Sequence, residues 1–246
     1  MTLRRVRLVL FALVLCGVWS PAQAAIGTDA TTTATPVASS TTITWNHTCQ
    51  AGSVIVVRSA WGQGNQSATA TYDGEAMTEL YDTPDSLPQN RAGAWILAAG
   101  ANCDNTSNPV VITYSSAVDL AGANASSYTG VDTATPNRAV FTASGQTTGA
   151  TVTVTNAQSG DWVLDTAAVL ATTLTPDASQ TIEWEDDAIA GGGTSGWASR
   201  ETATGSTVMS GSHGNAFWTI GAFALIPAGG AAAPRPSTLP LTGVGR

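Results

Sequence analysis

The sequence contains no lysine and few charged residues of any kind. Charged residues make up 11% of the 246, and the formal net charge is −8. Proteins that bind nucleic acids or anionic membrane surfaces use basic patches to neutralise phosphates, so the composition argues against both partners. Without a lysine amine, the chain also cannot form the isopeptide cross-links found in pilus shafts and some surface domains.

Helical patterning is absent as well, since no stretch places apolar residues at i, i+3 and i+4 between caps. Short apolar runs instead follow one another, separated by clusters of Gly, Asn, Asp and Pro. Thr151–Thr155 alternates strictly between Thr and Val, and Asp73-Gly74 indicates a type I′ hairpin turn. This pattern predicts an all-β fold, a single antiparallel β-sandwich or jelly roll of about a dozen strands over residues 41–227.

The stretch Gly160–Leu170 is the predicted centre of this sandwich. Its apolar residues fall on both alternating faces, which is typical of a strand covered on both sides. The run Phe217–Ile226 has the same character, and we expect the two to be neighbours.

The N-terminus has the features of a secretory signal peptide. Three arginines precede a short apolar run, and Ala22-Gln23-Ala24 forms a small-x-small cleavage site. We expect residues 1–24 to be removed on export. Residues 25–40 are rich in Thr and Ala and are either a leader linker or a loosely held first strand.

Two cysteines remain after the signal peptide, Cys49 and Cys103. In an oxidising compartment such a pair is most simply a disulfide, although two free thiols remain an alternative. The scattered histidines lack the spacing of a metal site.

Several motifs follow one another in a recognisable order. They are Thr44–Thr48 (TWNHT), Gly52–Arg58 (GSVIVVR), Thr71–Thr78 (TYDGEAMT), Ala94–Leu97 (AWIL), Tyr128–Asp132 (YTGVD) and Gly160–Asp165 (GDWVLD). This succession resembles a β-sandwich module of secreted bacterial proteins that has no known catalytic role. The resemblance implies a concanavalin-like jelly roll, and sandwiches of that shape often bind glycans.

The C-terminal segment, residues 228–246, is rich in Gly, Ala and Pro and is expected to be an extended spacer. It contains a sequence similar to the LPxTG signal of sortase-anchored surface proteins, with matching residues Leu239, Pro240, Thr242 and Gly243. Only three residues follow the motif, so either the signal is truncated or the match is accidental. We expect a secreted protein, anchored to the cell wall by a sortase if the signal is complete.

Catalytic motifs are scarce. His213 has no nucleophile elbow near it and is expected in a polar turn, and His47 is expected to be a structural, hydrogen-bonding histidine. Glu183 and Glu185 would share one face of a strand, about 7 Å apart, a spacing that glycoside hydrolysis can use. A solvated strand end explains this acidic run equally well, and we expect a protein without catalytic activity.

No cofactor is expected, but calcium is considered. Glu185, Asp186 and Asp187 precede a triple-glycine loop, and Asp104 with Asn105 forms a second oxygen-rich site. Neither spacing matches a known calcium loop.

The tryptophans carry the binding hypothesis. Trp95, Trp162 and Trp218 lie in apolar strands and are expected in the core. Trp61, Trp184 and Trp197 lie near glycine-rich or acidic loops, where exposed rings could stack on a sugar. Partial burial at the edges of the sandwich explains their positions equally well. Together with Glu185 they form the predicted site.

Three functions are therefore considered. The first is a binding or adhesion module for an extracellular glycan or cell-wall polymer. The second is a structural spacer without a specific ligand, and the third is a glycoside hydrolase.

Overall fold

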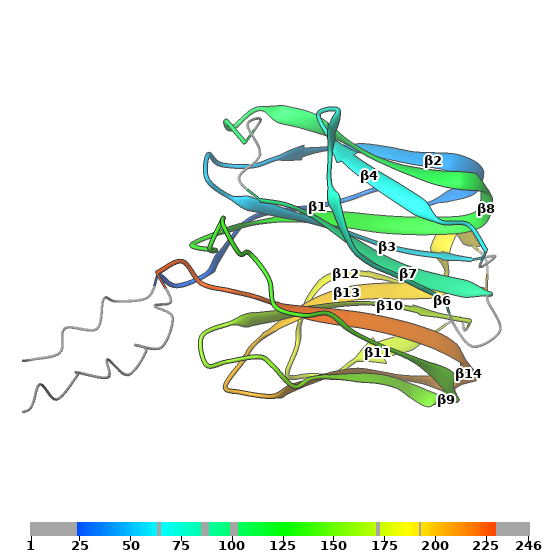
Figure 1. Cartoon of the computed structure of the whole chain (residues 1–246). Helices are drawn as coiled ribbons and strands as arrows, with labels where there is room; N and C mark the ends of the chain where they lie inside the picture. The colour runs from blue at the N-terminus through cyan, green and yellow to red at the C-terminus, as the bar shows by residue number, and fades with distance from the viewer. Residues whose placement is uncertain are drawn as a thin grey trace, which may run out of the picture.

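The chain forms two antiparallel β-sheets that pack against each other, which confirms the predicted all-β sandwich (Figure 1). The structure is a computed structural model and describes residues 24–62, 65–84, 89–98, 103–170, 173–191 and 193–229. No helix in these ranges is long and apolar enough to cross a membrane. The predicted signal peptide, residues 1–24, lies outside the described residues except for Ala24, and the LPxTG-like sequence lies outside them entirely.

The first sheet contains eight strands in the order β5-β4-β8-β3-β7-β6, with β1 and β2 also paired to β8. These are β1 (Gly27–Thr33), β2 (Val37–Thr48), β3 (Val54–Gly62), β4 (Ala68–Tyr72), β5 (Glu75–Ala76), β6 (Thr78–Pro84), β7 (Asn90–Leu97) and β8 (Ser107–Thr129). The Thr/Ala-rich leader is thus strand, because β1 and the start of β2 pair with β8.

The second sheet contains six strands in the order β11-β14-β10-β13-β12, with β9 paired to β14. These are β9 (Phe141–Val154), β10 (Trp162–Val169), β11 (Leu174–Pro176), β12 (Thr181–Asp186), β13 (Ser195–Thr202) and β14 (Thr207–Leu225), with a short 3-10 helix, η1 (Ile189–Gly191). As predicted, β10 is a central strand, and β14 is its neighbour.

Each sheet curls around a core of its own. The first part of β8 pairs with β4 and with the end of β2, whereas its second part pairs with β1, β3 and the start of β2. Residues such as Trp61 and Trp95 fill the space enclosed by this sheet. Trp197 and Trp218 fill the space enclosed by the second sheet, and a third core lies between the two sheets.

The two sheets repeat the same arrangement of strands. Strand β3 lies between β8 and β7, with β6 outside, just as β10 lies between β14 and β13, with β12 outside. Strands β1 and β2 together occupy the place of β9, and β4 occupies that of β11. We call β1–β8 the first repeat and β9–β14 the second repeat.

The correspondence extends to single residues. Val54–Trp61 pairs with β8 in eight consecutive steps without a bulge, and Trp162–Val169 pairs with β14 in the same way. Both strands follow a Gln-x-Gly turn in which the glycine has a positive φ. In the outer strands, β6 is irregular at Leu80 and β12 at Glu183, at matching points of the two ladders. The chain is thus built from two structural repeats.

Two local predictions are also confirmed. Asp73 and Gly74 have φ values of 48° and 80° and connect β4 to β5, as a type I′ turn requires. Cys49 and Cys103 form a disulfide across a sequence separation of 54 residues.

The close packing between the sheets gives a first prediction. A Cβ at position 122 would lie 2.5 Å from Cζ2 of Trp184. We therefore expect Gly122→Ala to lower the free energy of unfolding by about 2 kcal/mol through overpacking. Gly214→Ala is the control, because no atom lies within 4 Å of that Cβ position. Urea unfolding of both variants measures the effect, and equal stabilities would contradict the prediction.

Candidate functional site

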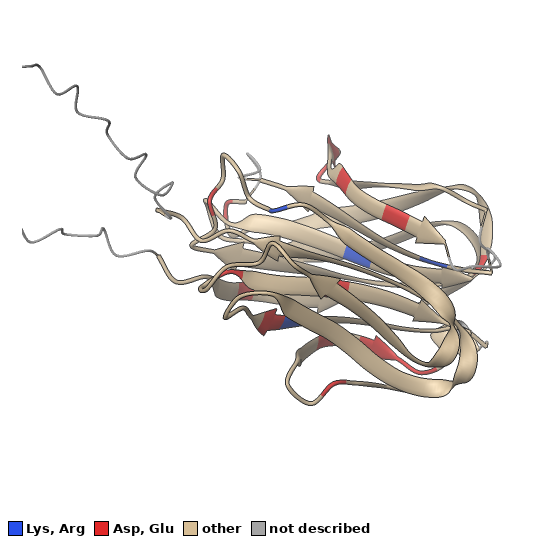
Figure 2. Cartoon of the chain, turned by 60° about the horizontal axis from the view of Figure 1, so that its bottom comes forward, with Lys and Arg blue, Asp and Glu red and all other residues tan. Residues whose placement is uncertain are grey.

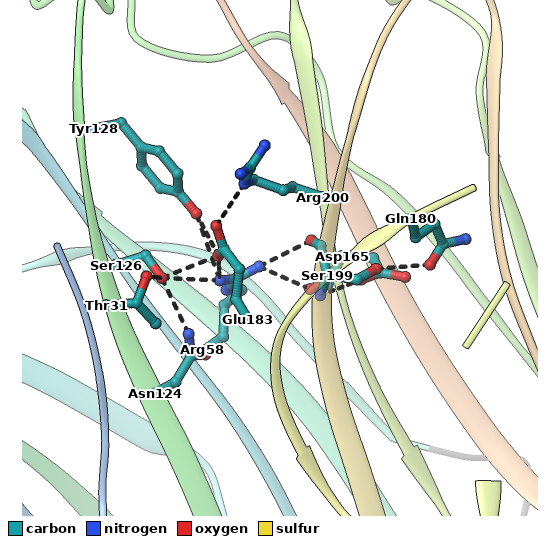
Figure 3. A network of polar contacts seen from close by, with 10 residues as sticks. All are labelled: Thr31, Arg58, Asn124, Ser126, Tyr128, Asp165, Gln180, Glu183, Ser199 and Arg200. Carbon is teal, nitrogen blue, oxygen red and sulfur yellow. Dashed lines mark hydrogen bonds and ion pairs between the residues drawn. The ribbon is translucent and has the colours of Figure 1, made fainter. Parts of the chain in front are cut away.

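A network of polar side chains lies between the two sheets and is centred on Arg58 of β3 (Figure 3). The Arg58 side chain is fully buried. Its Nη1 donates to the backbone carbonyls of Asp165 and Ser199, which pair on β10 and β13, over 3.3 and 3.0 Å. Its Nη2 forms an ion pair with Glu183 of β12. One side chain of the first sheet is thereby bonded to three strands of the second.

Glu183 collects the remaining donors of the network. Its Oε2 accepts hydrogen bonds from the hydroxyls of Tyr128, at 2.6 Å, and Ser126, at 2.9 Å. Nε of Arg200 lies 3.0 Å from its Oε1, and the Glu183 side chain is only 4% exposed. Burial acts to raise the pKa of Glu183, but the Arg58 charge and these hydrogen bonds hold it below its ordinary value. The carboxylate is therefore ionised and neutralised by arginine at neutral pH.

A second buried carboxylate, Asp165, lies on the other face of β10. Its Oδ1 accepts hydrogen bonds from the backbone N–H and the hydroxyl of Ser199, and its Oδ2 accepts one from Nε1 of Trp197. Burial raises the pKa of Asp165, although these hydrogen bonds oppose the rise. Asp165 and Ser199 thus take part in two polar clusters. Their side chains are bonded in the cluster with Trp197, and their backbone carbonyls accept hydrogen bonds from Arg58.

The network has no counterpart at the matching positions of the other repeat. The registers match Arg58 with Thr166, Glu183 with Leu80, Ser126 with Phe223 and Tyr128 with Leu225. Three of these four counterparts are apolar: Phe223 and Leu225 belong to the core between the sheets, and Leu80 packs against it. The same architecture therefore accommodates an apolar set, and the ion pair is not a requirement of the strand arrangement.

The tryptophans expected at the surface are buried. Trp61 is 0% exposed, because β3 continues to Gly62 and directs this ring into the core of the first sheet, against Trp95. Trp197 is also 0% exposed and lies in the core of the second sheet. The expectation that both rings line an open binding face is wrong.

Trp184 is 5% exposed and packs between the sheets, where Gly122 and Gly196 leave room for its ring. Its exposure was also predicted wrongly. Conversely, Trp162 was expected in the core but is partly exposed, with the Arg200 guanidinium 4.2 Å from its ring centre. Trp95 and Trp218 are buried as predicted.

The acidic pair considered for glycoside hydrolysis is divided between interior and solvent. The irregularity at Glu183 breaks the alternation of β12, so Glu183 points into the polar network while Glu185 is exposed. The prediction that the two carboxylates share one face is wrong. Glu185 has a raised pKa, caused first by partial burial and then by Asp187.

Three of the residues considered for calcium accept hydrogen bonds from the backbone. An oxygen of Asp186 accepts a hydrogen bond from the N–H of Ala188, and Asp187 accepts one from Leu174. Asp104 likewise accepts from Thr106, and Asn105 adopts a positive φ of 68° in that turn. Among the described residues, no group of three or more His, Cys, Asp or Glu is placed to hold a metal ion.

His47 is a structural residue, as predicted. Thr32 Oγ1 accepts a hydrogen bond from Trp45 Nε1, which can only donate, so the Thr32 hydroxyl hydrogen is free for Nδ1 of His47, 2.9 Å away. Burial lowers the pKa of His47 to about 4, although Asp29 acts to raise it. His213 lies within β14 at an irregular point, and not in the turn that was expected.

The described surface is hollowed along the first half of β14. The hollow consists of three adjoining depressions. The first and second share the lining residues Asp177 and Ser210, and the second and third share Thr175 and Ser212. The second depression has a volume of about 490 Å³. We call them together the hydroxyl groove, which is lined by residues 149–151, 173–179, 201–202, 204, 206–208 and 210–214. The lining consists mainly of Thr, Ser and Gly and includes Asp177 and Glu201, but no arginine.

Charge is sparse over the rest of the chain too. Figure 2 shows few basic residues, whereas acidic residues occur in both sheets and in the loops. The sequence reasoning missed the hydroxyl groove because Thr and Ser occur throughout the chain. Part of the groove is lined by the short strand β11, which ends at Pro176. Neither the Thr and Ser residues nor a three-residue strand marks a site in the sequence alone.

Comparisons with known proteins give little further information. No protein-family model and no curated protein matches this chain. Among solved structures, the ANX2 ectodomain from Arabidopsis thaliana is 7% identical, with 86% of this chain and 93% of that chain covered and a TM-score of 0.27. A similarity this low carries no argument about function.

The buried ion pair gives a second prediction. Glu183→Leu leaves the Arg58 charge buried without its partner, so we expect a loss of about 3 to 5 kcal/mol in the free energy of unfolding. Adding Arg58→Met should recover part of this loss, because the matching positions of the other repeat are occupied without an ion pair. A double-mutant cycle in urea should give a coupling energy of about 2 kcal/mol. Additive effects would contradict the prediction.

His47 gives a third prediction, for stability in acid. Its folded pKa of about 4 lies below the unfolded value of 6.5, so the unfolded chain binds the proton more readily. Its contribution is present above pH 6.5 and is lost as the pH falls toward 4, by about 3 kcal/mol in total. His47→Gln should remove this part of the pH dependence of unfolding, whereas the control His213→Gln should retain most of it. Parallel pH profiles for wild type and His47→Gln would contradict the assignment.

Proposed function

We propose that this protein is a secreted, non-catalytic binding domain that recognises a neutral extracellular polysaccharide through the hydroxyl groove. The observation that carries the proposal is the groove's chemistry. Its Thr and Ser hydroxyls both donate and accept hydrogen bonds, and Asp177 and Glu201 add strong acceptors. Sugar hydroxyls match such a lining, and anionic ligands are disfavoured by its carboxylates.

The shape of the groove supports an extended ligand. The depressions are shallow and continuous, so they suit several sugar units lying along β14 better than one enclosed molecule. Ala178 is exposed there and offers a small apolar surface for the C–H face of a ring. Because no tryptophan lines the groove, we expect weaker binding than in sites where a ring stacks on the sugar.

The location of the protein is proposed from its sequence and its disulfide. The signal peptide and the Cys49–Cys103 bond both fit an oxidising extracellular compartment. The resemblance to secreted bacterial jelly-roll modules and the LPLTG sequence support a place at the cell surface, held by a sortase. The alternative is a structural spacer without a ligand, and the burial of Glu183 between two arginines supports a non-catalytic role under either reading.

The fourth prediction tests the groove. The chain without residues 1–24 is titrated with a panel of neutral and charged oligosaccharides and followed by isothermal calorimetry. We expect saturable binding to one neutral class and about a tenfold weaker affinity in Glu201→Gln, which removes one charged acceptor. The control is Glu75→Gln, because Glu75 is exposed on β5 in the other sheet.

Two outcomes would contradict the proposal. No binding across the panel by folded protein would favour the structural alternative. Binding that Glu201→Gln and Glu75→Gln affect equally would place the glycan outside the groove.

A further inference from the structure

Strand β9 forms a long edge of the second sheet without the usual protection against pairing. It has 14 residues and pairs only with β14 among the described strands (Figure 1). Its other side therefore presents backbone N–H and C=O groups that take no part in the sheet. The strand contains no charged residue and no proline, the two devices that most often block an edge.

The other edges of the two sheets are protected. Strands β6 and β12 carry carboxylates and are each irregular at one point. Strands β5 and β11 have only two and three residues. The edge that matches β9 in the first repeat is divided into β1 and β2 around Pro36, carries Asp29, and has a positive φ at Ser39. Strand β9 also has one irregular point in its pairing with β14, opposite residues 213–215. Within Phe141–Val154, however, it has no charge, no proline and no positive φ.

The end of β9, together with Thr155 of the turn that follows it, is especially suited to pairing with itself. Thr151–Thr155 reads Thr-Val-Thr-Val-Thr, which is the same in both directions around Thr153. In an antiparallel pair of identical strands, a two-fold axis passes between a residue and its own copy. An axis at Thr153 places Thr151 opposite Thr155 and Val152 opposite Val154, so every pair is Thr–Thr or Val–Val. Such β-branched pairs stabilise antiparallel strands.

We propose that two copies of this chain associate through β9, with Thr151–Thr155 of each pairing antiparallel around Thr153 to join the two second sheets. Charge favours a second copy at this place. The chain carries a net charge of −8, so contact between most of its surfaces is opposed by repulsion. This edge brings no carboxylate opposite another. The valines already face the core of their own sheet, while Thr151 and Thr153 are exposed.

The association should have a characteristic response to salt. Because the two copies carry the same sign of charge and the paired edge carries none, screening reduces only the repulsion. Added sodium chloride is therefore expected to strengthen the dimer, whereas it would weaken an interface held by ion pairs.

The fifth prediction tests this interface by sedimentation velocity of the chain without residues 1–24, with no glycan present. We expect a monomer–dimer equilibrium at concentrations of up to about 1 mM, the range of weak, small interfaces. Thr153→Lys places two ammonium groups opposite each other and should abolish the dimer. Thr142→Lys, on an exposed residue of the same strand outside the palindrome, should leave it unchanged. Unchanged circular dichroism and thermal midpoints show that both variants fold.

Cross-linking gives an independent measurement of the register. Directly opposed residues of antiparallel strands have Cα atoms about 4.5 to 5.5 Å apart, within the range of a disulfide. Thr153→Cys should form a covalent dimer under mild oxidation, and Thr142→Cys should form much less. A wild-type monomer at all concentrations, a dimer that persists in Thr153→Lys, or equal cross-linking of both cysteine variants would overturn the proposal. If the protein is a monomer, the unpaired edge of β9 would be a binding site for a different protein.

Discussion

The buried guanidinium of Arg58 bonds the first sheet to three strands of the second. An arginine without exposure cannot lose its proton, so its buried charge requires acceptors. Nη1 and Nη2 both have them, whereas Nε has no partner in the described structure. Those acceptors come from β8, β10, β12 and β13, and three of the five interactions reach the second sheet. The relative position of the sheets is therefore set by hydrogen-bond geometry as well as by apolar packing. A purely apolar contact would tolerate sliding, whereas a buried charge with fixed partners does not.

The repeat explains why this ion pair is informative. Two strand arrangements with the same registers provide an internal comparison, since the fold is constant and only the side chains differ. At one pair of matching positions the first repeat has Leu80 and the second has Glu183. At another pair the first repeat has Arg58 and the second has Thr166. The polar set occurs once, so it distinguishes one side of the contact between the sheets from the other. Specificity of packing is the role that the structure supports for it.

Much of the fold could be predicted from the sequence, because its signals are local. Alternating Thr and Val, apolar runs on both faces and the Asp73-Gly74 turn each depend on neighbouring residues, and each was interpreted correctly. The tryptophans were not, because exposure depends on which face of a curled sheet a residue occupies. Polar neighbours of Trp61 and Trp184 suggested solvent, yet each ring points to the interior. The signals that could have helped are distant glycines, such as Gly122 beneath Trp184, and the repeated Gln-x-Gly turn.

The three cores also determine what remains for recognition. Two curled sheets and the contact between them enclose nearly all of the large side chains, and Leu170, Ile182 and Val208 are the large apolar residues left exposed among those described. The outer faces are consequently made of Thr, Ser and Gly, with few charges. A surface of this composition has two means of binding, its hydroxyl groups and the free backbone of its edges. The hydroxyl groove on the face of β14 uses the first and the edge of β9 uses the second. Because pairing at an edge leaves the faces of a sheet open, association through β9 would place two grooves on one continuous sheet, with Thr151 belonging to both the groove and the paired edge.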